Sequence, residues 1–180
     1  MLGMEDAASS TRPGRVVLLN GPPSCGKTSL AVALQRTLAE PWFHLSLDDF
    51  RAGYPQERWI ADDGSLFEPI MLGYLGSLRQ LALAGINLLA EAVMSPNRRD
   101  LYADTFRGLP VVVVGVHCTY DEALRREQLR PDRQGGPMEL PLEAFTAVHS
   151  AMDYDLEVDT TAMSSESLAR QLATRLETAR

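Results

Sequence analysis

The feature that most constrains this chain of 180 residues is a glycine-containing string around its single lysine. Residues 21–28 read Gly-Pro-Pro-Ser-Cys-Gly-Lys-Thr, a full match to the phosphate-binding pattern G-x-x-x-x-G-K-S/T. Every other cationic side chain except histidine is arginine. Lys27 therefore stands where a compact, flexible ammonium is needed and a planar guanidinium cannot replace it. The string predicts a loop that holds the phosphates of a nucleotide.

The segments on both sides of this string support the prediction. Residues 15–20 are apolar and rich in β-branched side chains, as in a buried strand, and residues 28–38 carry apolar side chains at helical spacing. In such a unit of strand, loop and helix, backbone N–H groups and the helix N-terminus surround a triphosphate. We expect Lys27 on the β- and γ-phosphates and the Thr28 hydroxyl on Mg²⁺. The predicted nucleotide contacts in this unit are Gly21, Pro22, Pro23, Ser24, Cys25, Gly26, Lys27, Thr28 and Ser29.

The charge and the N-terminal segment limit the partners. A net charge of −7 argues against a general nucleic-acid surface, which needs a clustered excess of basic groups. Residues 1–14 are small and polar and lack the apolar core of a signal peptide, and no stretch reaches the roughly 18 apolar residues of a membrane span. We expect a frayed tail at residues 1–14 and a single domain over residues 15–180. The expected protein is cytoplasmic, a monomer or small homo-oligomer, and binds neither nucleic acid nor membrane.

The two cysteines, Cys25 and Cys118, are too few for a disulfide framework and show no zinc-ligand spacing. Cys118 ends an apolar strand and is expected in the core. Cys25 lies in the phosphate loop, where a helix N-terminus lowers the pKa of a thiol. It is therefore either an oxidant-sensitive thiol or a small side chain that fills a tight turn.

Strand patterns alternate with helical patterns along the rest of the chain. Further strands are expected at residues 43–47, 86–90, 109–116 and 156–159, and further helices at 68–84 and 164–178. This alternation predicts a mostly parallel sheet with right-handed crossovers. Ligands of such sheets bind beyond the carboxyl ends of the strands. Asp48, Asp49 and Glu91 follow strand ends, so we expect them at the same edge as the phosphate loop.

Asp48 and Glu91 are the candidate acids for phosphoryl transfer, a reaction that requires alignment and charge neutralisation. Asp48 either accepts the proton of a substrate hydroxyl or holds Mg²⁺ through water, and its structural alternative is to cap a helix that starts near Phe50. Glu91 either holds the water shell of the metal or hydrogen-bonds the substrate, and otherwise it is an exposed acid at a strand end. The predicted metal ligands are Thr28, Asp48 and Glu91.

Residues 51–68 are rich in Gly, Pro, Asp and aromatic side chains and indicate a long irregular excursion of a kind that is usually functional inside a compact domain. With the helical stretch that follows, residues from about 50 to 84 are expected to form the substrate-binding part. Trp59 either packs or lines a pocket for an aromatic or sugar-bearing substrate. The predicted substrate contacts are Asp48, Asp49, Phe50, Trp59, Glu91 and Met94.

A basic helix end and a hinge-like loop, over about residues 126–141, predict a lid. Such a lid folds over the nucleotide and places Arg130 and Arg133 on the transferring phosphate. The alternative is that its arginines pair with glutamates of the same helix at i,i+4 spacing. Further nucleotide contacts are predicted for Arg126, Arg130 and Thr160, and the predicted catalytic residues are Lys27, Asp48, Arg130 and Arg133.

Several strings over residues 16–161 together resemble the chloramphenicol phosphotransferase-like family of small P-loop kinases. The phosphate loop is common to many families, whereas Tyr154–Thr161 and the Asp-Arg pair before the glycines of the lid are more particular. The shared strings are Leu18-Leu19-Asn20-Gly21, Ser24-Cys25-Gly26-Lys27-Thr28, Glu40-Pro41-Trp42, Leu47-Asp48-Asp49, Val114-Gly115-Val116-His117-Cys118, Arg130-Pro131-Asp132-Arg133, Val148-His149 and Tyr154-Asp155-Leu156-Glu157-Val158-Asp159-Thr160-Thr161.

The resemblance implies an α/β P-loop kinase fold, with a five-stranded parallel sheet in the order 2-3-1-4-5 flanked by helices. It also implies ATP-dependent phosphorylation of a small-molecule hydroxyl, with antibiotic inactivation as the named activity of the family. Asp48 then matches the acid proposed as general base, and Arg133 matches a lid arginine near the phosphates. One departure is Glu91-Ala92, where the family enzyme has paired aspartates. The acceptor is therefore chloramphenicol, a nucleoside antibiotic or another hydroxylated metabolite.

Three functions are open at this point. The first is a kinase that uses Mg²⁺ and transfers the γ-phosphoryl of ATP or GTP to an alcohol on a small natural product. The second is a primary-metabolic kinase of shikimate, gluconate or nucleotide type, although the chain has no Gly-Gly-Gly stretch after the third strand as in shikimate kinases. The third is a nucleotide-binding regulatory module, which needs neither Asp48 nor an arginine lid.

Overall fold

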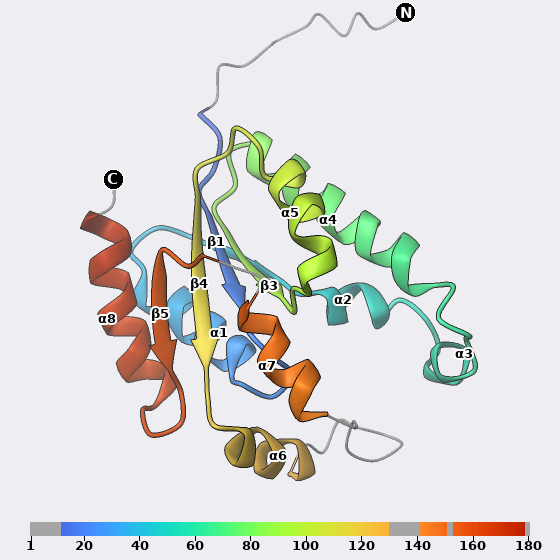
Figure 1. Cartoon of the computed structure of the whole chain (residues 1–180). Helices are drawn as coiled ribbons and strands as arrows, with labels where there is room; N and C mark the ends of the chain where they lie inside the picture. The colour runs from blue at the N-terminus through green and yellow to red at the C-terminus, as the bar shows by residue number, and fades with distance from the viewer. Residues whose placement is uncertain (1–11, 130–140, 151–152, 179–180) are drawn as a thin grey trace, which may run out of the picture.

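A five-stranded parallel sheet forms the centre of the protein (Figure 1). The computed structural model describes residues 12–129, 141–150 and 153–178. The strands are β1 (Val16–Asn20), β2 (Phe43–Leu45), β3 (Leu88–Ala92), β4 (Val111–His117) and β5 (Leu156–Asp159). They lie in the order β2-β3-β1-β4-β5, and each neighbouring pair is parallel, so the predicted order and direction are confirmed.

The central strand β1 is buried along its whole length, which accounts for its unbroken apolar run. It pairs with β3 on one side and with β4 on the other. In this register Leu19 lies opposite Glu91 of β3, and Asn20 lies opposite Gly115 of β4. Glu91 is therefore level with the last residues of β1, where the phosphate loop begins.

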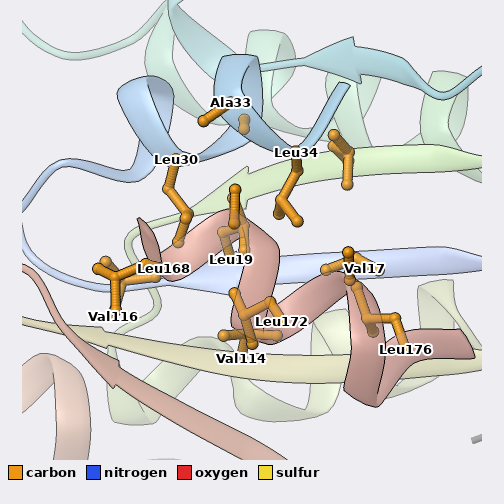
Figure 2. Close-up of a cluster of buried hydrophobic side chains, with 14 of the residues drawn as sticks. Val17, Leu19, Leu30, Ala33, Leu34, Val114, Val116, Leu168, Leu172 and Leu176 are labelled. Carbon is orange, nitrogen blue, oxygen red and sulfur yellow. The ribbon is translucent and has the colours of Figure 1, made fainter. Parts of the chain in front are cut away.

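Helices cover both faces of the sheet. Figure 1 shows α1 (Lys27–Thr37) and α8 (Ser165–Thr178) on one face, and α4 (Phe67–Leu83) and α5 (Arg99–Thr105) on the other. Side chains alternate along a strand, so β1 contributes Val17 and Leu19 to the first cluster and Val16 and Leu18 to the second. Figure 2 shows the first cluster, where leucines of α1 and α8 meet valines of β1 and β4. Each such buried side chain contributes roughly 1.5–3 kcal/mol.

Short helices gather at the carboxyl edge of the sheet. They are α2 (Leu47–Arg51), α3 (Gln56–Ile60), the 3₁₀ helix η1 (Pro96–Arg98), α6 (Tyr120–Gln128) and α7 (Leu142–Ser150). Three of them follow directly on strands: α2 follows β2, η1 follows β3 and α6 follows β4. This is the edge at which parallel sheets bind ligands. No helix in the described parts of the chain combines the length and the apolar character that a membrane crossing demands.

The predicted end of the second strand was wrong. β2 ends at Leu45, and Asp48 and Asp49 lie in the first turn of α2 instead of directly behind a strand. The cause is a capping box, in which Asp49 Oδ2 accepts a hydrogen bond of 2.7 Å from the backbone N–H of Ser46. The capping acid is thus Asp49, and Asp48 is left for another role.

Two further boundaries differ from the predictions. The segment expected to be irregular over residues 51–68 contains α3, which begins directly after Pro55. The third strand runs two residues later than predicted, so Glu91 lies inside β3. Its exposed fraction is 8%, which excludes the alternative of an exposed acid at a strand end.

Candidate functional site

The phosphate loop connects the end of β1 with the start of α1, and its backbone explains its residues. The φ angle is 59° at Ser24 and 95° at Gly26, both in the left-handed region. At Gly21 the constraint is space, because a β-carbon would lie 2.4 Å from the carbonyl oxygen of Val116. Glycine allows the left-handed backbone at Gly26 and the close approach at Gly21. A loop that turns in this way directs successive N–H groups inward and makes an anion-binding concavity.

Lys27 lies across this loop with 8% of its surface exposed. Its Nζ donates hydrogen bonds of 2.9 Å to the carbonyl oxygens of Gly21 and of Pro22. These carbonyls orient the ammonium but carry no net charge. A buried cation in a loop of this kind is stabilised by an anion, which a phosphate supplies.

Cys25 is fully buried behind the loop. Burial raises the pKa of its thiol, although the ammonium of Lys27 acts in the opposite direction. Of the two alternatives for Cys25, the oxidant-sensitive thiol is therefore disfavoured, since desolvation outweighs the contributions that lower the pKa. Cys25 is a small side chain that fills a tight turn.

A chain of polar contacts joins α1, β3 and β2 beside the loop. Thr28 Oγ1 donates a hydrogen bond of 3.0 Å to Glu91 Oε2, and His44 Nε2 lies 2.8 Å from Glu91 Oε1. Tyr74 holds the backbone of the same residue, because its hydroxyl donates to the carbonyl oxygen of Glu91 at 2.8 Å. The carboxylate is thereby oriented from both sides. The contact of His44 with Glu91 joins residues 47 positions apart in the sequence, and it is visible only in three dimensions.

Thr28 and Glu91 fit the requirements of Mg²⁺. Mg²⁺ takes one or two carboxylates, keeps several waters and completes its shell with phosphate oxygens. The hydroxyl and the carboxylate are adjacent, and both residues line the cavity described next. Within the described part of the chain no three His, Cys, Asp or Glu side chains form a metal cluster. A metal held by Thr28 and Glu91 would take its remaining ligands from phosphate oxygens and water.

A cavity of about 800 Å³ opens at the carboxyl edge of the sheet. It joins the phosphate loop to a region walled by α2, α4 and the segment after β3. Predicted site residues that line it are Ser24, Pro23, Gly26, Lys27, Thr28, Ser29, Asp48, Trp59, Glu91 and Arg126. The prediction missed Ser46, Leu47, Arg51, Phe67, Met71, Ala92, Val93, Arg98 and Tyr102.

Three predicted substrate contacts do not line this cavity. Asp49 is held in the capping box of α2. Phe50 packs into the core with its ring edge-on to Tyr74 at 5.6 Å between centroids. Met94 is fully buried, and its N–H donates to Asn20 Oδ1 at 2.9 Å. A periodic pattern does not reveal which side of a turn faces a cavity, and this is why the sequence misplaced them.

Asp48 does line the cavity, and it forms an ion pair with Arg51 there. Its carboxylate is 64% exposed and accepts a hydrogen bond of 2.8 Å from Arg51 Nη1 one helical turn later. The guanidinium of Arg51 in turn lies 4.7 Å from the ring centroid of Trp59. The ion pair keeps an oxygen acceptor at the cavity wall.

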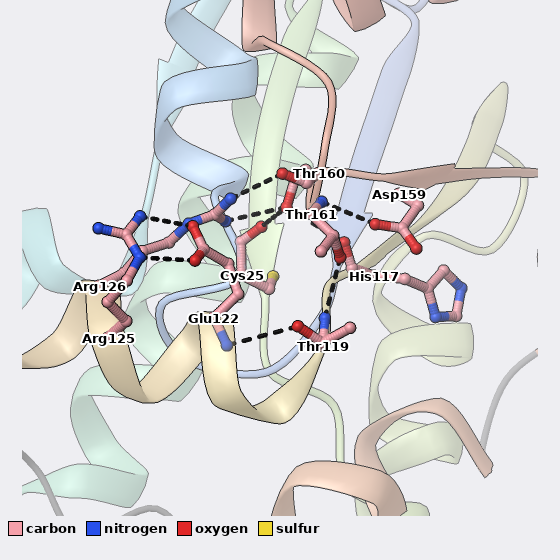
Figure 3. Close-up of polar contacts among 9 residues, drawn as sticks. All are labelled: Cys25, His117, Thr119, Glu122, Arg125, Arg126, Asp159, Thr160 and Thr161. Carbon is pink, nitrogen blue, oxygen red and sulfur yellow. Dashed lines mark hydrogen bonds and ion pairs between the residues drawn. The ribbon is translucent and has the colours of Figure 1, made fainter.

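Arg126 and Thr160 tie three segments together at the other side of the loop, as Figure 3 shows. Arg126 donates to Thr160 Oγ1 at 2.9 Å and to Glu122 Oε1 at 2.7 Å, and Thr160 Oγ1 donates to the carbonyl oxygen of Cys25 at 2.7 Å. Hydrogen bonds from Arg125 and then Arg126 lower the pKa of Glu122 to about 2. A smaller cavity of about 270 Å³ lies here, lined by Gly26, Ser29, Arg126, Thr160, Met163, Ser164 and Ser165.

The helix that leads into the predicted lid contacts the phosphate loop directly. Ser24 Oγ donates a hydrogen bond to Glu127, whose carboxylate is buried. The end of α6 thus lies beside the phosphate loop, and the predicted lid that follows it stays a prediction. The predicted catalytic residues Arg130 and Arg133 lie outside the described residues.

His149 on α7 does not line the cavity. Its Nδ1 lies 2.8 Å from the hydroxyl of Tyr154, which also accepts a hydrogen bond of 2.8 Å from Asn20 Nδ2. Its ring stacks on His117 at 3.9 Å between centroids. Burial lowers the pKa of His149 to about 4, and the neighbouring His117 adds to this effect. The cluster anchors α7 to the end of β1.

The comparisons with known proteins agree with this geometry. The model of a family described as "Chloramphenicol phosphotransferase-like protein" matches residues 14–177. The chain belongs to the chloramphenicol phosphotransferase-like family. The "Putative O-phosphotransferase Rv2636" of Mycobacterium tuberculosis is 32% identical to it over 186 residues, which cover 88% of this chain and 80% of that protein. As a member of this family, the chain described here is a phosphotransferase that acts on a small molecule.

Solved structures extend the comparison to the fold. The shikimate kinase of Acinetobacter baumannii has a TM-score of 0.66 at 17% identity, with 94% of this chain and 96% of that chain covered. The APS kinase CysC of Mycobacterium tuberculosis has a TM-score of 0.59 at 20% identity, with 92% and 98% covered. Because the sequence identities are at most 20%, these two structures support the P-loop kinase fold of this chain and say nothing of its substrate.

Proposed function

We propose that the protein transfers the γ-phosphoryl group of ATP or GTP to a hydroxyl of a small natural product. Antibiotics of chloramphenicol or nucleoside type are the first candidates, and phosphorylation would then confer resistance. One observation carries the proposal: a single cavity joins the phosphate loop, with Lys27 and Thr28, to a wall of large side chains that includes Trp59 and Phe67. A phosphate donor and an organic acceptor fit side by side in such a space.

The donor end has the parts that a nucleoside triphosphate requires. The loop amides and Lys27 bind phosphate oxygens, and the smaller cavity beside Arg126 and Thr160 accommodates the base and sugar. Thr28 and Glu91 would hold Mg²⁺, and His44 keeps the Glu91 carboxylate in position. When bound, Mg²⁺ supplies positive charge that offsets the charge of the transferring phosphates.

Asp48 is the residue we assign to the acceptor hydroxyl. Its carboxylate would accept the hydroxyl proton while the hydroxyl oxygen bonds to the γ-phosphorus, the bond from that phosphorus to the β–γ bridging oxygen breaks, and the nucleoside diphosphate leaves. Arg51 holds this carboxylate by the ion pair of 2.8 Å. A role as an outer metal ligand is the alternative for Asp48. Arg130 and Arg133 keep their predicted role of stabilising charge on the transferred group.

The direct experiment screens antibiotics and other hydroxylated compounds with the purified protein, ATP and Mg²⁺, and detects a mass gain of one phosphate. Asp48→Asn should lower turnover by roughly two to four orders of magnitude and leave nucleotide affinity nearly intact. Asp49→Asn is the matched control, because the neighbouring acid lies in the same helix but does not line the cavity. Full activity of Asp48→Asn would refute the role of Asp48.

The same screen separates the rival functions. Phosphorylation of central metabolites in preference to every antibiotic would identify a primary-metabolic kinase. Nucleotide binding with no acceptor in any class would favour a regulatory module. A kinase for natural products is favoured because the acceptor end is wide and walled by Trp59, Phe67, Met71 and Tyr102. We further infer that the protein acts in the cytoplasm as a monomer or small homo-oligomer.

A further inference from the structure

The acceptor end of the main cavity carries a cation that phosphoryl transfer does not require. Among the described residues, six side chains that are charged at neutral pH line the cavity: Lys27, Asp48, Arg51, Glu91, Arg98 and Arg126. Lys27, Arg126 and Glu91 lie around the phosphate loop, and Arg51 pairs with Asp48. Within the described part of the chain, Arg98 is thus the cation at the acceptor end that has no acid partner among the residues lining the cavity.

The contacts of Arg98 leave much of its hydrogen-bonding capacity open. Its Nη1 donates at 3.0 Å to the thioether sulfur of Met71, which is a weak acceptor. Its Nη2 lies 3.2 Å from Glu68 Oε2, and the side chain of Glu68 is 55% exposed. Exposed ion pairs of this kind contribute little, so Glu68 can exchange Arg98 for water.

The aromatic side chains hold the guanidinium in one place. Cζ of Arg98 lies 4.7 Å from the ring centroid of Phe67, and 27% of the side chain is exposed. Arg51 is arranged alike, at 4.7 Å from the ring of Trp59. In addition, the Nε of Arg51 is buried and has no hydrogen-bond partner among the described residues. A buried donor without a partner is costly, and a ligand oxygen would satisfy it.

Much of the remaining lining of the cavity at this end is apolar. It is formed by Trp59, Phe67, Met71, Ala92, Val93 and Tyr102. Tyr102 adds a hydroxyl to this wall, and burial raises its pKa to about 12. Planar guanidinium groups beside aromatic faces match a ring that bears a carboxylate, because carboxylates bind arginine through two parallel hydrogen bonds.

We propose that, among hydroxylated natural products, the acceptor is an aromatic or similarly apolar hydroxy acid in preference to the neutral antibiotics named above, and that Arg98, assisted by Arg51, binds its carboxylate. The hydroxyl that receives the phosphoryl group would point to Asp48, and the apolar body would lie between Trp59 and Phe67. The assignment of Arg98 to the carboxylate rests on the contacts in the cavity. Only the claim that the hydroxyl is phosphorylated rests on the proposed function.

The test uses matched pairs of ligands and measures binding by calorimetry. Each pair holds an aromatic hydroxy acid and its primary amide, with 3-phenyllactate and 3-phenyllactamide as the first pair. We expect at least one acid to bind about tenfold or more tightly than its amide. Arg98→Gln should weaken binding of that acid by roughly 10- to 100-fold and change binding of the amide little.

Arg99→Gln is the matched control, because Arg99 is the next residue, is exposed, and pairs with Asp153 away from the cavity. It should keep the preference for the acid. Glu68→Gln removes the competing carboxylate and should tighten binding of the acid by a few fold. Thermal unfolding of each variant, without ligand, establishes that the fold is retained.

Two outcomes overturn the inference: no acid binds better than its amide, or Arg98→Gln keeps the preference. The proposed function can fail separately. If the acid binds through Arg98 but no compound gains a phosphate, the carboxylate site stands and the kinase proposal fails. If neutral alcohols are phosphorylated equally by the wild type and by Arg98→Gln, the kinase proposal stands and the carboxylate site fails.

Discussion

Replacement of Gly26 by alanine tests whether the phosphate loop depends on its left-handed backbone. Gly26 has a φ of 95°, and an added β-carbon would lie 3.3 Å from Arg126 Nη1 and 3.5 Å from Thr160 Oγ1. Those two atoms form a hydrogen bond of 2.9 Å, and the methyl group would force Arg126 Nη1 to shift by a few tenths of an ångström, which weakens this bond. Two separate costs follow, one from the backbone and one from the contact.

Two other glycines separate these costs. Gly64 has a φ of 97° but open space around its missing β-carbon, and Gly73 lies in α4 with open space and an ordinary φ. Gly64→Ala should lower the free energy of unfolding by roughly 0.5–1.5 kcal/mol, since a left-handed alanine costs about 1–2 kcal/mol and the stiffer unfolded chain returns part of it. Gly73→Ala should raise it by roughly 0.5–1 kcal/mol, the helix propensity difference.

Gly26→Ala combines the backbone cost with a damaged hydrogen bond, which is worth roughly 0.5–1.5 kcal/mol more. We expect a total loss of about 1–3 kcal/mol in urea unfolding without nucleotide. The affinity for a non-hydrolysable ATP analogue should fall at least about tenfold by calorimetry, because the loop amides no longer converge. Gly64→Ala and Gly73→Ala should bind the analogue as the wild type does. Wild-type affinity in Gly26→Ala would refute the assignment of this loop to phosphate binding.

Two further predictions concern the residues around the loop. Glu91→Gln keeps the shape of the contacts with Thr28 and His44 but removes the charge, so the Mg²⁺ concentration needed for tight ATP binding should rise by roughly 10- to 100-fold in a titration; an unchanged requirement would contradict the metal role. The pKa of His149 is lowered from 6.5 to about 4, so the unfolded state binds the proton first, and the free energy of unfolding should fall as the pH drops from 6.5 to 4. His149→Gln should flatten this slope in urea unfolding, and an equally steep slope would show that other groups cause it.

The local patterns along the chain predicted the framework well. A strand pattern, a glycine-containing string and a helix pattern in series were enough to predict the phosphate loop. The alternation of strand and helix patterns was enough to predict the parallel sheet. The same local logic failed at Asp48 and Asp49, although a signal was present. Ser46 and an acid three residues later form a capping box, which starts a helix where the apolar pattern alone continued a strand.

The sequence could not predict which residues line the acceptor end of the cavity, and the reason is physical. Phe67, Met71 and Arg98 come from α4 and from the segment after β3, and they converge only because β3 and α4 pack together in the second core cluster. Met94 and Val93 are neighbours, yet Met94 is fully buried and Val93 lines the cavity. No spacing rule distinguishes two adjacent residues in an irregular segment.

The sequence by itself determined the donor half of this protein, because phosphate binding depends on backbone shape and on one lysine within eight consecutive residues. Tertiary structure alone decided three other matters: the raised pKa of the Cys25 thiol, the contact of His44 with Glu91, and the position of Arg98 in the lining of the main cavity. Desolvation and charge pairing depend on what surrounds a group in space, and segments far apart in the chain supply those surroundings.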